Sequence, residues 1–474
     1  MKKLSLLIMV MLTGCQALGI DYKRSESPLP STYSVPESPQ NKAAGDVIKP
    51  WWTHYQDEKL NELVDLALKN NTNIALSTAR IEEADASMRE VGAYLLPEVN
   101  LSAAATRNKV TELGAFPVFI APIRNNYTFG LNTSYELDFW GKITRAKEAA
   151  RAAALGARDA KVTVELSLIG LVASNYLQMR GLDAQIAVTQ DNQKSRSESL
   201  DLTKRRLAGG VASALEVSQA EVALSNLDAQ LIELGRLRSV TLHQLAILTG
   251  VLDLTLAHAD IRGLSLPPEP PAGLPSRLLE NRPDIRQAEQ NLIAENAQIG
   301  IAKAALYPSI SLTAAYGGES LLLKNLLKSG ARIWTLGLGL DLPIFDGGKR
   351  KARVEQVTAK QKQALAQYQT AIQNAFREVN DALVNRRLNA EREQALMRSA
   401  SAAKNALIVS ENRYKSGYSA YLDVLDAQRV YNDAAIAAIQ AKQAAYLASV
   451  ELFKVLGGDW RSAAPAASDA KPAS

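Results

Sequence analysis

Several residue types that build catalytic or metal centres are scarce in this chain. Its 474 residues include one cysteine and three histidines, so neither a disulfide framework nor a zinc cluster is supported. The histidines, His54, His243 and His258, lie far apart, and no nucleophile stands beside an obvious general base. The segment Gly347-Gly348-Lys349 lacks the first glycine and the final Ser or Thr of a phosphate loop. We therefore expect no enzyme activity, no metal site and no cofactor.

Long apolar runs are also absent. No stretch of eighteen or more apolar residues occurs, so no membrane-spanning helix is predicted. No concentrated basic patch carries interleaved aromatic residues, so nucleic acid is not an expected partner. Proline is missing from residues 123–266 and 344–464, which are rich in Ala, Leu, Gln, Glu, Lys and Arg, a composition that favours long helices. The predicted helices are 72–96, 142–208, 213–249, 284–306, 348–415 and 420–457.

Four short segments alternate between apolar and polar residues. In Tyr127–Phe139, for example, Phe129 and Leu131 fall on one face of a strand and Asn132 on the other. A wet face and an apolar face suit a transmembrane barrel strand, although an ordinary half-buried strand of a soluble sheet has the same pattern. The predicted strands are 98–108, 127–139, 309–317 and 332–345.

Four strands are too few to close a barrel. The smallest membrane barrels use about eight strands. An open edge in lipid would leave backbone groups unpaired at a cost of several kcal/mol each. If these strands lie in a membrane, the chain must therefore share its barrel with copies of itself, and closed cyclic symmetry is the expected arrangement.

The start of the chain resembles a bacterial lipoprotein signal. Basic residues precede a short apolar run, and the box Leu12-Thr13-Gly14-Cys15 implies cleavage after residues 1–14 and acylation of Cys15. The alternative is a plain secretory signal with a chance cysteine. Gln16 after the cysteine implies sorting to the outer membrane, and acyl chains would anchor the amino terminus. Residues 15–50 are rich in Pro and Ser and are predicted to be a lipid-anchored linker.

The two halves of the chain are similar to each other. Residues 70–108 match residues 281–319, and residues 206–220 match residues 413–427, with Gly210 aligned with Gly417. The sequence therefore predicts two structural repeats, 51–259 and 284–460.

The segments outside the repeats have their own composition. The connector 260–283 contains six prolines and is interpreted as a stiff linker, with a PxxP recognition site as the alternative. The Trp51-Trp52 pair is expected to mark the start of the folded body and to pack there. The Ala, Ser and Pro tail 461–474 is predicted to be disordered.

Together these features resemble the TolC-like outer-membrane factor family, specifically its lipoprotein members that serve efflux pumps. The resemblance covers about 51–460. The segments that carry it, besides the lipoprotein box, are YELDFWGK (135–142), ENRPDIRQAE (280–289), ALYPSISLTAAYG (305–317), PIFDGGK (343–349), RYKSGYSAYLDVLDAQR (413–429) and LGGDW (456–460).

The resemblance implies an α+β membrane protein: a homotrimer with a twelve-stranded β-barrel, four strands per chain, continuous with a long periplasmic α-helical barrel. It implies the outer-membrane channel of a tripartite efflux system, a passive exit duct for drugs or other small toxic compounds. The implied partners are a periplasmic membrane-fusion adaptor and an inner-membrane transporter, for which a proton-driven pump is expected. The alternative is a periplasmic lipid-anchored adaptor or structural lipoprotein that does not span the membrane.

The resemblance also implies a gate at the periplasmic end of the tunnel. The matching acidic residues are Asp423 and Asp426, three apart on a helix, which a trimer would assemble into a ring whose like charges raise the carboxylate pKa values. Arg413 and Tyr414 match residues near the closing contacts of the family. Ser419 stands where some relatives have a basic residue. The alternative is that the two aspartates are solvated helix carboxylates.

Adaptor docking is implied at the two turns that separate the long helices. The docking residues carried over are Gly210 and Val211 in the first repeat and Gly417 and Tyr418 in the second. The alternative is that glycine at these places serves only to reverse the chain. We give equal weight to turn formation and to contact with the adaptor.

Overall fold

The computed structural model describes residues 17–24, 30, 32–33, 50–111, 113, 122–268 and 282–458. Cys15, the predicted signal peptide 1–14 and the predicted tail 461–474 lie outside the described residues, as do residues 269–281 of the connector and most of the linker.

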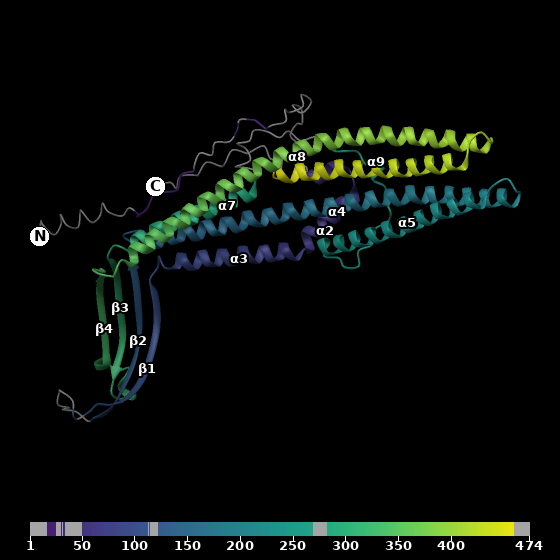
Figure 1. Cartoon of the computed structure of the whole chain (residues 1–474). Helices are drawn as coiled ribbons and strands as arrows, with labels where there is room; N and C mark the ends of the chain where they lie inside the picture. Colours follow the sequence, from purple (N-terminus) through teal and green to yellow (C-terminus); the bar gives the residue numbers. More distant parts are fainter. Residues whose placement is uncertain are drawn as a thin grey trace. The chain divides into compact units, whose positions relative to one another are not determined.

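Both halves of the chain contain a helix, two strands, a very long helix and a shorter helix, in that order (Figure 1). In the first half these are α3 (Thr72–Ala93), β1 (Glu98–Lys109), β2 (Ile123–Leu137), α4 (Lys142–Ala208) and α5 (Ala214–Thr249). In the second half they are α7 (Pro283–Ala304), β3 (Ser309–Ser320), β4 (Arg332–Asp341), α8 (Lys349–Lys415) and α9 (Tyr421–Val455). The first half begins with an additional short helix, α2 (Glu58–Asn70), whose N-cap is Asp57.

Two predicted strands are shorter at their carboxyl ends than expected, and both corrections have a local cause. Phe139 lies outside β2, because the Asp138 carboxylate before it accepts hydrogen bonds from the Ile143 and Thr144 amides and so begins α4. Residues 342–345 lie outside β4, where Pro343 has no N–H to offer the ladder. In both segments the alternation of apolar and polar residues extends beyond the last paired residue of the strand, so the alternation predicted a carboxyl end that is too late.

The four strands form one antiparallel sheet in the order β1-β2-β3-β4. Its register places Leu101 opposite Leu131, Leu131 opposite Tyr316, and Tyr316 opposite Trp334. The middle of this face of the sheet is therefore apolar across all four strands, and its large side chains are exposed. Among the strands described, β1 and β4 each pair on one side only, so the sheet has two open edges.

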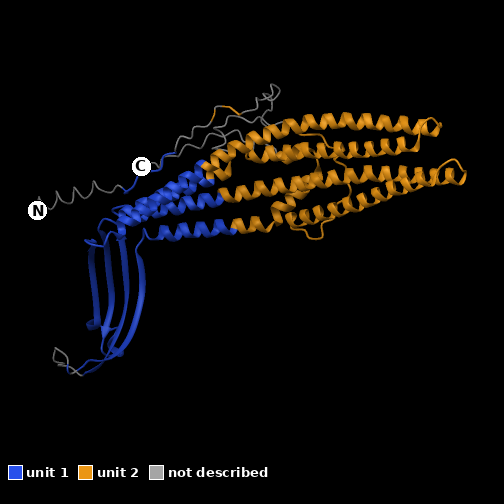
Figure 2. Ribbon diagram, viewed as in Figure 1, with its two compact units in different colours: residues 1–27, 79–158, 287–369 blue, residues 28–78, 159–286, 370–474 orange. Residues whose placement is uncertain are grey.

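The described chain divides into two compact units, and neither coincides with one of the predicted repeats (Figure 2). Unit 1 comprises residues 1–27, 79–158 and 287–369, and it holds the sheet with the helical segments next to it. Unit 2 comprises residues 28–78, 159–286 and 370–474. Each unit combines segments from both halves of the sequence; in unit 1, for example, β2 of the first half pairs with β3 of the second half.

Unit 2 has the larger apolar core. Trp51 is fully buried and stacks on Phe453, with ring centroids 5.3 Å apart, which places the start of the folded body in the core rather than on a binding surface. The Asp57 carboxylate accepts a hydrogen bond from the Tyr176 hydroxyl at 2.9 Å and pairs with Arg180. Burial is the main cause of the raised pKa of Tyr176, reinforced by the Asp57 charge.

In unit 1 the segment that follows the predicted acylation site is held by hydrogen bonds and ion pairs. The Leu18 amide donates to the Trp140 carbonyl at 3.0 Å, at the junction of β2 and α4. Arg24 donates two hydrogen bonds of 2.7 Å to the Glu289 carboxylate of α7, and Tyr22 donates to the same group at 3.0 Å. Glu289 is buried, so this pairing fixes the path of residues 18–24.

Candidate functional site

The turn between α4 and α5 and the turn between α8 and α9 have the same backbone conformation. Gly210 and Gly417 have φ angles of 73° and 79°, in the left-handed region that favours glycine. The Val211 amide donates to the Arg206 carbonyl, and the Tyr418 amide donates to the Arg413 carbonyl, at 2.9 Å and 2.8 Å. This is the hydrogen bond of a Schellman cap in both cases. No heavy atom lies within 4 Å of a Cβ added to either glycine, so the backbone angle alone requires glycine.

Both turns present apolar side chains to solvent. Val211 is 70% exposed and Tyr418 is 79% exposed. One turn further along the helices, Leu215 and Leu422 are also exposed. These four residues occupy equivalent positions in the two halves of the sequence. Exposed apolar groups gathered on two similar turns are typical of a surface that another protein covers.

Behind the turns, a small cluster joins the two helical hairpins of unit 2. We call it the tip joint, and its buried members are Leu200, Ala220, Tyr414, Tyr421 and Val424. The rings of Tyr414 and Tyr421 lie 5.4 Å apart. The guanidinium carbon of Arg206, from α4, lies 4.6 Å from the centroid of the Tyr414 ring, which is a cation–π geometry.

Tyr421 of α9 also lies near Thr203 and Arg196 of α4, and both residues act on its hydroxyl group. Burial is the main cause of the raised pKa of Tyr421, while the Thr203 side chain and the charge of Arg196 act in the opposite direction. The Tyr414 and Ser419 hydroxyls are buried and have no hydrogen-bond partner among the described residues. All four helices of the tip therefore contribute residues to the tip joint.

The two predicted gate aspartates are both exposed on α9. The Asp426 carboxylate accepts a hydrogen bond from Arg429 at 2.8 Å, and Arg429 also lies 3.7 Å from Asp433. Asp423 forms no ion pair with any residue that the structure describes. Arg413 is exposed as well, so the structure separates the predicted gate residues into an exposed group and the buried Tyr414 of the tip joint.

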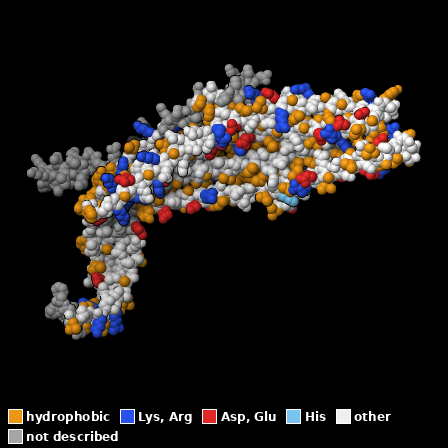
Figure 3. Space-filling model, in the orientation of Figure 1, with side chains coloured by type: hydrophobic (Ala, Val, Ile, Leu, Met, Phe, Trp, Pro, Cys, Tyr) orange, Lys and Arg blue, Asp and Glu red, His pale blue; other side chains and the backbone are white. Residues whose placement is uncertain are grey.

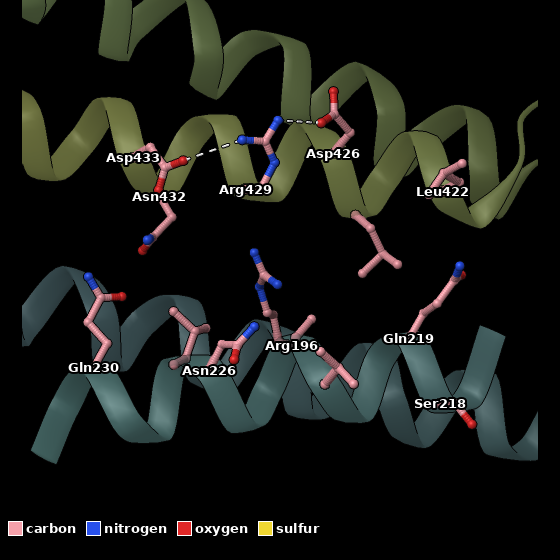
Figure 4. Close-up of a pocket in the computed structure, with 14 residues that line it drawn as sticks. Arg196, Ser218, Gln219, Asn226, Gln230, Leu422, Asp426, Arg429, Asn432 and Asp433 are labelled. Atoms are coloured by element: carbon pink, nitrogen blue, oxygen red, sulfur yellow. Dashed lines mark hydrogen bonds and ion pairs between the residues drawn. The ribbon is translucent and has the colours of Figure 1, made fainter. Parts of the chain in front are cut away.

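A cavity of about 590 Å³ lies beside the tip joint, between α4, α5 and α9 (Figure 4). Asp426 from α9 and Gln219 from α5, which are equivalent positions of the two repeats, line it from facing helices. Arg196 of α4 also lines the cavity, and burial there lowers the pKa of its guanidinium. At the far end the Asn192 amide donates to the Asn432 side-chain oxygen at 2.7 Å.

Sequence reasoning missed Arg206, Thr203, Tyr421 and Arg429. The spacing of Arg429, three residues after Asp426, predicts their ion pair on a helix. Thr203 and Arg206 are distant in sequence from Tyr421 and Tyr414, and only the folded chain brings them together.

The protein-family comparison places the chain in a known family. The model described as "Outer membrane efflux protein" matches residues 63–251 and again residues 274–458. The two matches together cover most of the chain, which therefore belongs to the outer membrane efflux protein family. The second match begins within the predicted connector 260–283.

Individual relatives agree along nearly their full lengths. OprJ, an outer membrane protein of Pseudomonas aeruginosa, is 33% identical over 96% of this chain and 95% of its own. SilC of Salmonella typhimurium, whose full name is "Probable outer membrane lipoprotein SilC", is 28% identical over 97% of this chain and 99% of its own. The crystal structure of the Campylobacter jejuni CmeC outer membrane channel superposes with a TM-score of 0.86 at 26% identity, covering 94% of this chain and 95% of CmeC.

These comparisons confirm the α+β fold and the predicted channel function. The chain is an outer-membrane channel of efflux systems, located in the outer membrane with its helices in the periplasm. The comparisons favour this function over the alternative of a periplasmic lipoprotein that does not span the membrane. Within the described residues, no helix combines the length and the apolar character needed to cross a membrane.

Proposed function

We propose that three copies of the chain form a passive exit duct that opens and closes at the tip of unit 2. The observation that carries this proposal is the tip joint, in which Tyr414 and Tyr421 hold the α8–α9 hairpin against the α4–α5 hairpin. The joint is small and consists of apolar, ring and cation–π contacts, so it can separate without unfolding either hairpin. Opening is then a population shift driven by a partner that binds the separated state better.

Asp423 and Asp426 form the ion-selective part of this gate. Both carboxylates are exposed in one chain, which leaves them available to face a shared axis. A threefold axis would bring six carboxylates together at the narrow end, where they would attract cations and bind divalent ions. Arg429 holds Asp426 from the same helix and limits the directions in which this carboxylate points.

Single-channel conductance in planar bilayers tests the gate. The Asp423→Ala, Asp426→Ala double variant should conduct more current and lose preference for cations relative to the unaltered protein. Asp201→Ala is the matched control, because it removes an exposed carboxylate from α4 outside the cavity. Unchanged conductance and ion selectivity in the double variant would show that these aspartates are solvated helix residues only.

The four-stranded sheet closes into a β-barrel by pairing with the sheets of the other two copies. The unpaired edges of β1 and β4 are antiparallel strands of similar length, 12 and 10 residues, so β4 of one copy can pair with β1 of the next. Three copies give twelve strands. Cross-links between cysteines introduced at Val99 and Leu340 should trap trimers in detergent; monomers alone would contradict the closure.

Cys15 anchors the chain in the membrane through acyl chains, as the lipoprotein box and the similarity to SilC support. Metabolic labelling with a palmitate analogue should mark the protein, and Cys15→Ala should abolish the label. Retention of label by the variant would exclude Cys15 as the acylated residue.

The partners that we infer are a periplasmic membrane-fusion adaptor, docked at the turns of Gly210, Val211, Gly417 and Tyr418, and a proton-driven inner-membrane transporter. The cargo class is drugs or other small toxic compounds. The exposed Val211 and Tyr418 side chains support the docking site. Cross-linking in cells, followed by identification of the captured inner-membrane protein, tests the transporter; an ATP-driven pump in its place would contradict that part of the proposal.

A further inference from the structure

Charge is distributed unevenly along the sheet of unit 1. At the end next to the helices, β1 begins at Glu98 and β4 ends at Asp341. At the opposite end, β1 finishes with Arg107 and Lys109, and β4 begins with Arg332. The helices lie in the periplasm, so the basic end of the sheet is the end that reaches the outer leaflet of the membrane.

The strand register shows which face these basic residues share. Side chains two apart on a strand lie on the same face, so Arg107 and Lys109 continue the apolar face that contains Leu101. By the same rule Arg332, two residues before Trp334, lies on the apolar face of β4. These three basic side chains therefore extend the lipid-facing surface rather than the polar interior face.

Aromatic residues mark the level at which the apolar face meets these basic residues. Tyr316 and Trp334 are partners in the register and are 58% and 76% exposed. Exposed Tyr and Trp gather where a membrane protein passes from acyl chains to headgroups. Arg332 comes two residues before Trp334, on the side away from the helices, so it lies at headgroup level.

The connection between β3 and β4 adds two more basic residues to this end. Lys324 and Lys328 are exposed and stand next to the exposed side chains of Leu323 and Leu327, the latter 82% exposed. A segment in which lysines stand beside exposed leucines suits a boundary where headgroups and acyl chains are both within reach.

These five residues, Arg107, Lys109, Lys324, Lys328 and Arg332, we call the basic rim; Figure 3 shows Lys and Arg side chains gathered at the far end of the sheet. Within the part of the chain that the structure describes, none of them forms an ion pair. The nearby acid Glu319 accepts a hydrogen bond from Asn126 at 2.8 Å instead. The rim therefore presents charge that the described residues leave unneutralised.

We propose that the basic rim binds the phosphate groups of lipids in the outer leaflet of the membrane. Arg107 and Arg332 can each hold a phosphate through two parallel hydrogen bonds, and the lysines add point charges. The apolar face next to the rim receives the acyl chains of the same lipid. This combination selects a phosphorylated amphiphile over free phosphate, because free phosphate has no acyl chains to contact Trp334 or the exposed leucines.

Binding of diphosphorylated lipid A to the purified full-length protein in detergent tests the proposal. The unaltered protein should bind it saturably, and affinity should fall as salt is raised. The Arg107→Gln, Lys109→Gln, Arg332→Gln variant should bind at least about tenfold more weakly, because each basic residue near an anionic lipid surface contributes to binding. Restoring charge with Arg332→Lys in place of Arg332→Gln should recover part of the loss.

Arg124→Gln is the matched control, since Arg124 lies at the same end of the sheet and, by strand alternation, on the opposite face. It should bind lipid A within about twofold of the unaltered protein. Lipid A without phosphates should bind as weakly as the triple variant, and pyrophosphate alone should compete poorly.

Three results would overturn the proposal. Equal binding of lipid A with and without phosphates would exclude phosphate recognition. Equal losses in the triple variant and in Arg124→Gln would exclude a lipid-facing site. Full competition by pyrophosphate would identify the ligand as free phosphate. Conductance in bilayers, measured on the same variants, separates these outcomes from a failure of the channel itself.

Discussion

Arg206 of α4 lies over the ring of Tyr414 of α8, with 4.6 Å between the guanidinium carbon and the ring centroid. The Tyr414 hydroxyl has no hydrogen-bond partner among the described residues, so in this structure the ring face is the interacting part of the side chain. A cation–π contact is worth about 1 kcal/mol at a partly exposed site. The contact between the two hairpins is therefore strong enough to bias a gate and weak enough to be broken by a partner.

Replacing Arg206 should favour the open gate. Arg206→Gln removes about 1 kcal/mol from the closed contact, which corresponds to a roughly fivefold rise in the open-to-closed ratio. Open probability in planar bilayers measures this ratio. Arg205→Gln, on the neighbouring exposed residue, should leave it unchanged. Equal open probability in the two variants would remove Arg206 from the gate, and Tyr414→Phe should behave like the unaltered protein because the ring is retained.

Stability of the tip should fall at alkaline pH. Burial raises the pKa of Tyr421 in the folded state, so this tyrosine stabilises the fold fully below its unfolded pKa of about 10, and that contribution is lost as pH rises through the folded pKa. Tyr421→Phe lacks the ionisation, and it also loses the interaction of the buried hydroxyl with the Thr203 side chain. The variant should have a lower free energy of unfolding than the unaltered protein at neutral pH. This difference between the two proteins should narrow above about pH 10, where the unaltered protein loses stability.

Thermal unfolding followed by circular dichroism across this pH range measures the gap. Tyr418→Phe is the control on an exposed tyrosine of the same tip, and it should lower the stability of the protein less than Tyr421→Phe does at neutral pH. A constant gap for Tyr421→Phe would mean that Tyr421 ionises equally in the folded and unfolded chain.

Alanine at the second turn should destabilise it through backbone conformation. Gly417 has a φ of 79°, and a left-handed conformation costs a residue with a Cβ about 1–2 kcal/mol. Gly417→Ala should lower the melting temperature of the protein. Gly235→Ala is the opposite control, because Gly235 lies within α5 with no heavy atom within 4 Å of an added Cβ, and alanine there should stabilise by up to about 1 kcal/mol. Equal effects at the two positions would contradict this account.

Charge on the exposed turns should block docking without altering the channel. Val211→Asp together with Tyr418→Asp places carboxylates on both proposed docking turns, and a partner would have to desolvate them. Cross-linking of the adaptor in cells should fall at least about tenfold, while conductance of the purified channel should stay the same. The control Ile232→Asp changes an exposed apolar residue in the middle of α5, away from the turns. Full cross-linking in the double variant would place the adaptor elsewhere.

The elements of this fold follow closely from sequence, whereas the contacts between them do not. Absence of proline over long alanine-rich stretches predicted either one long helix or two stacked helices in each half, where the structure has the single helices α4 and α8, and alternation predicted four strands. Alternation alone could not show that Pro343 ends the ladder early. Pairing of Tyr421 with Thr203 depends on how two hairpins pack, and no local pattern encodes it. The gate and docking residues came from family resemblance, so their roles remain predictions.

The open edges of the sheet have a consequence for biogenesis. A newly exported chain carries backbone donors and acceptors along β1 and β4 that lipid cannot satisfy, so entering the bilayer alone would be costly. Sister chains must meet before or during insertion. The rate at which channels mature should therefore depend steeply on how many chains are being secreted at once.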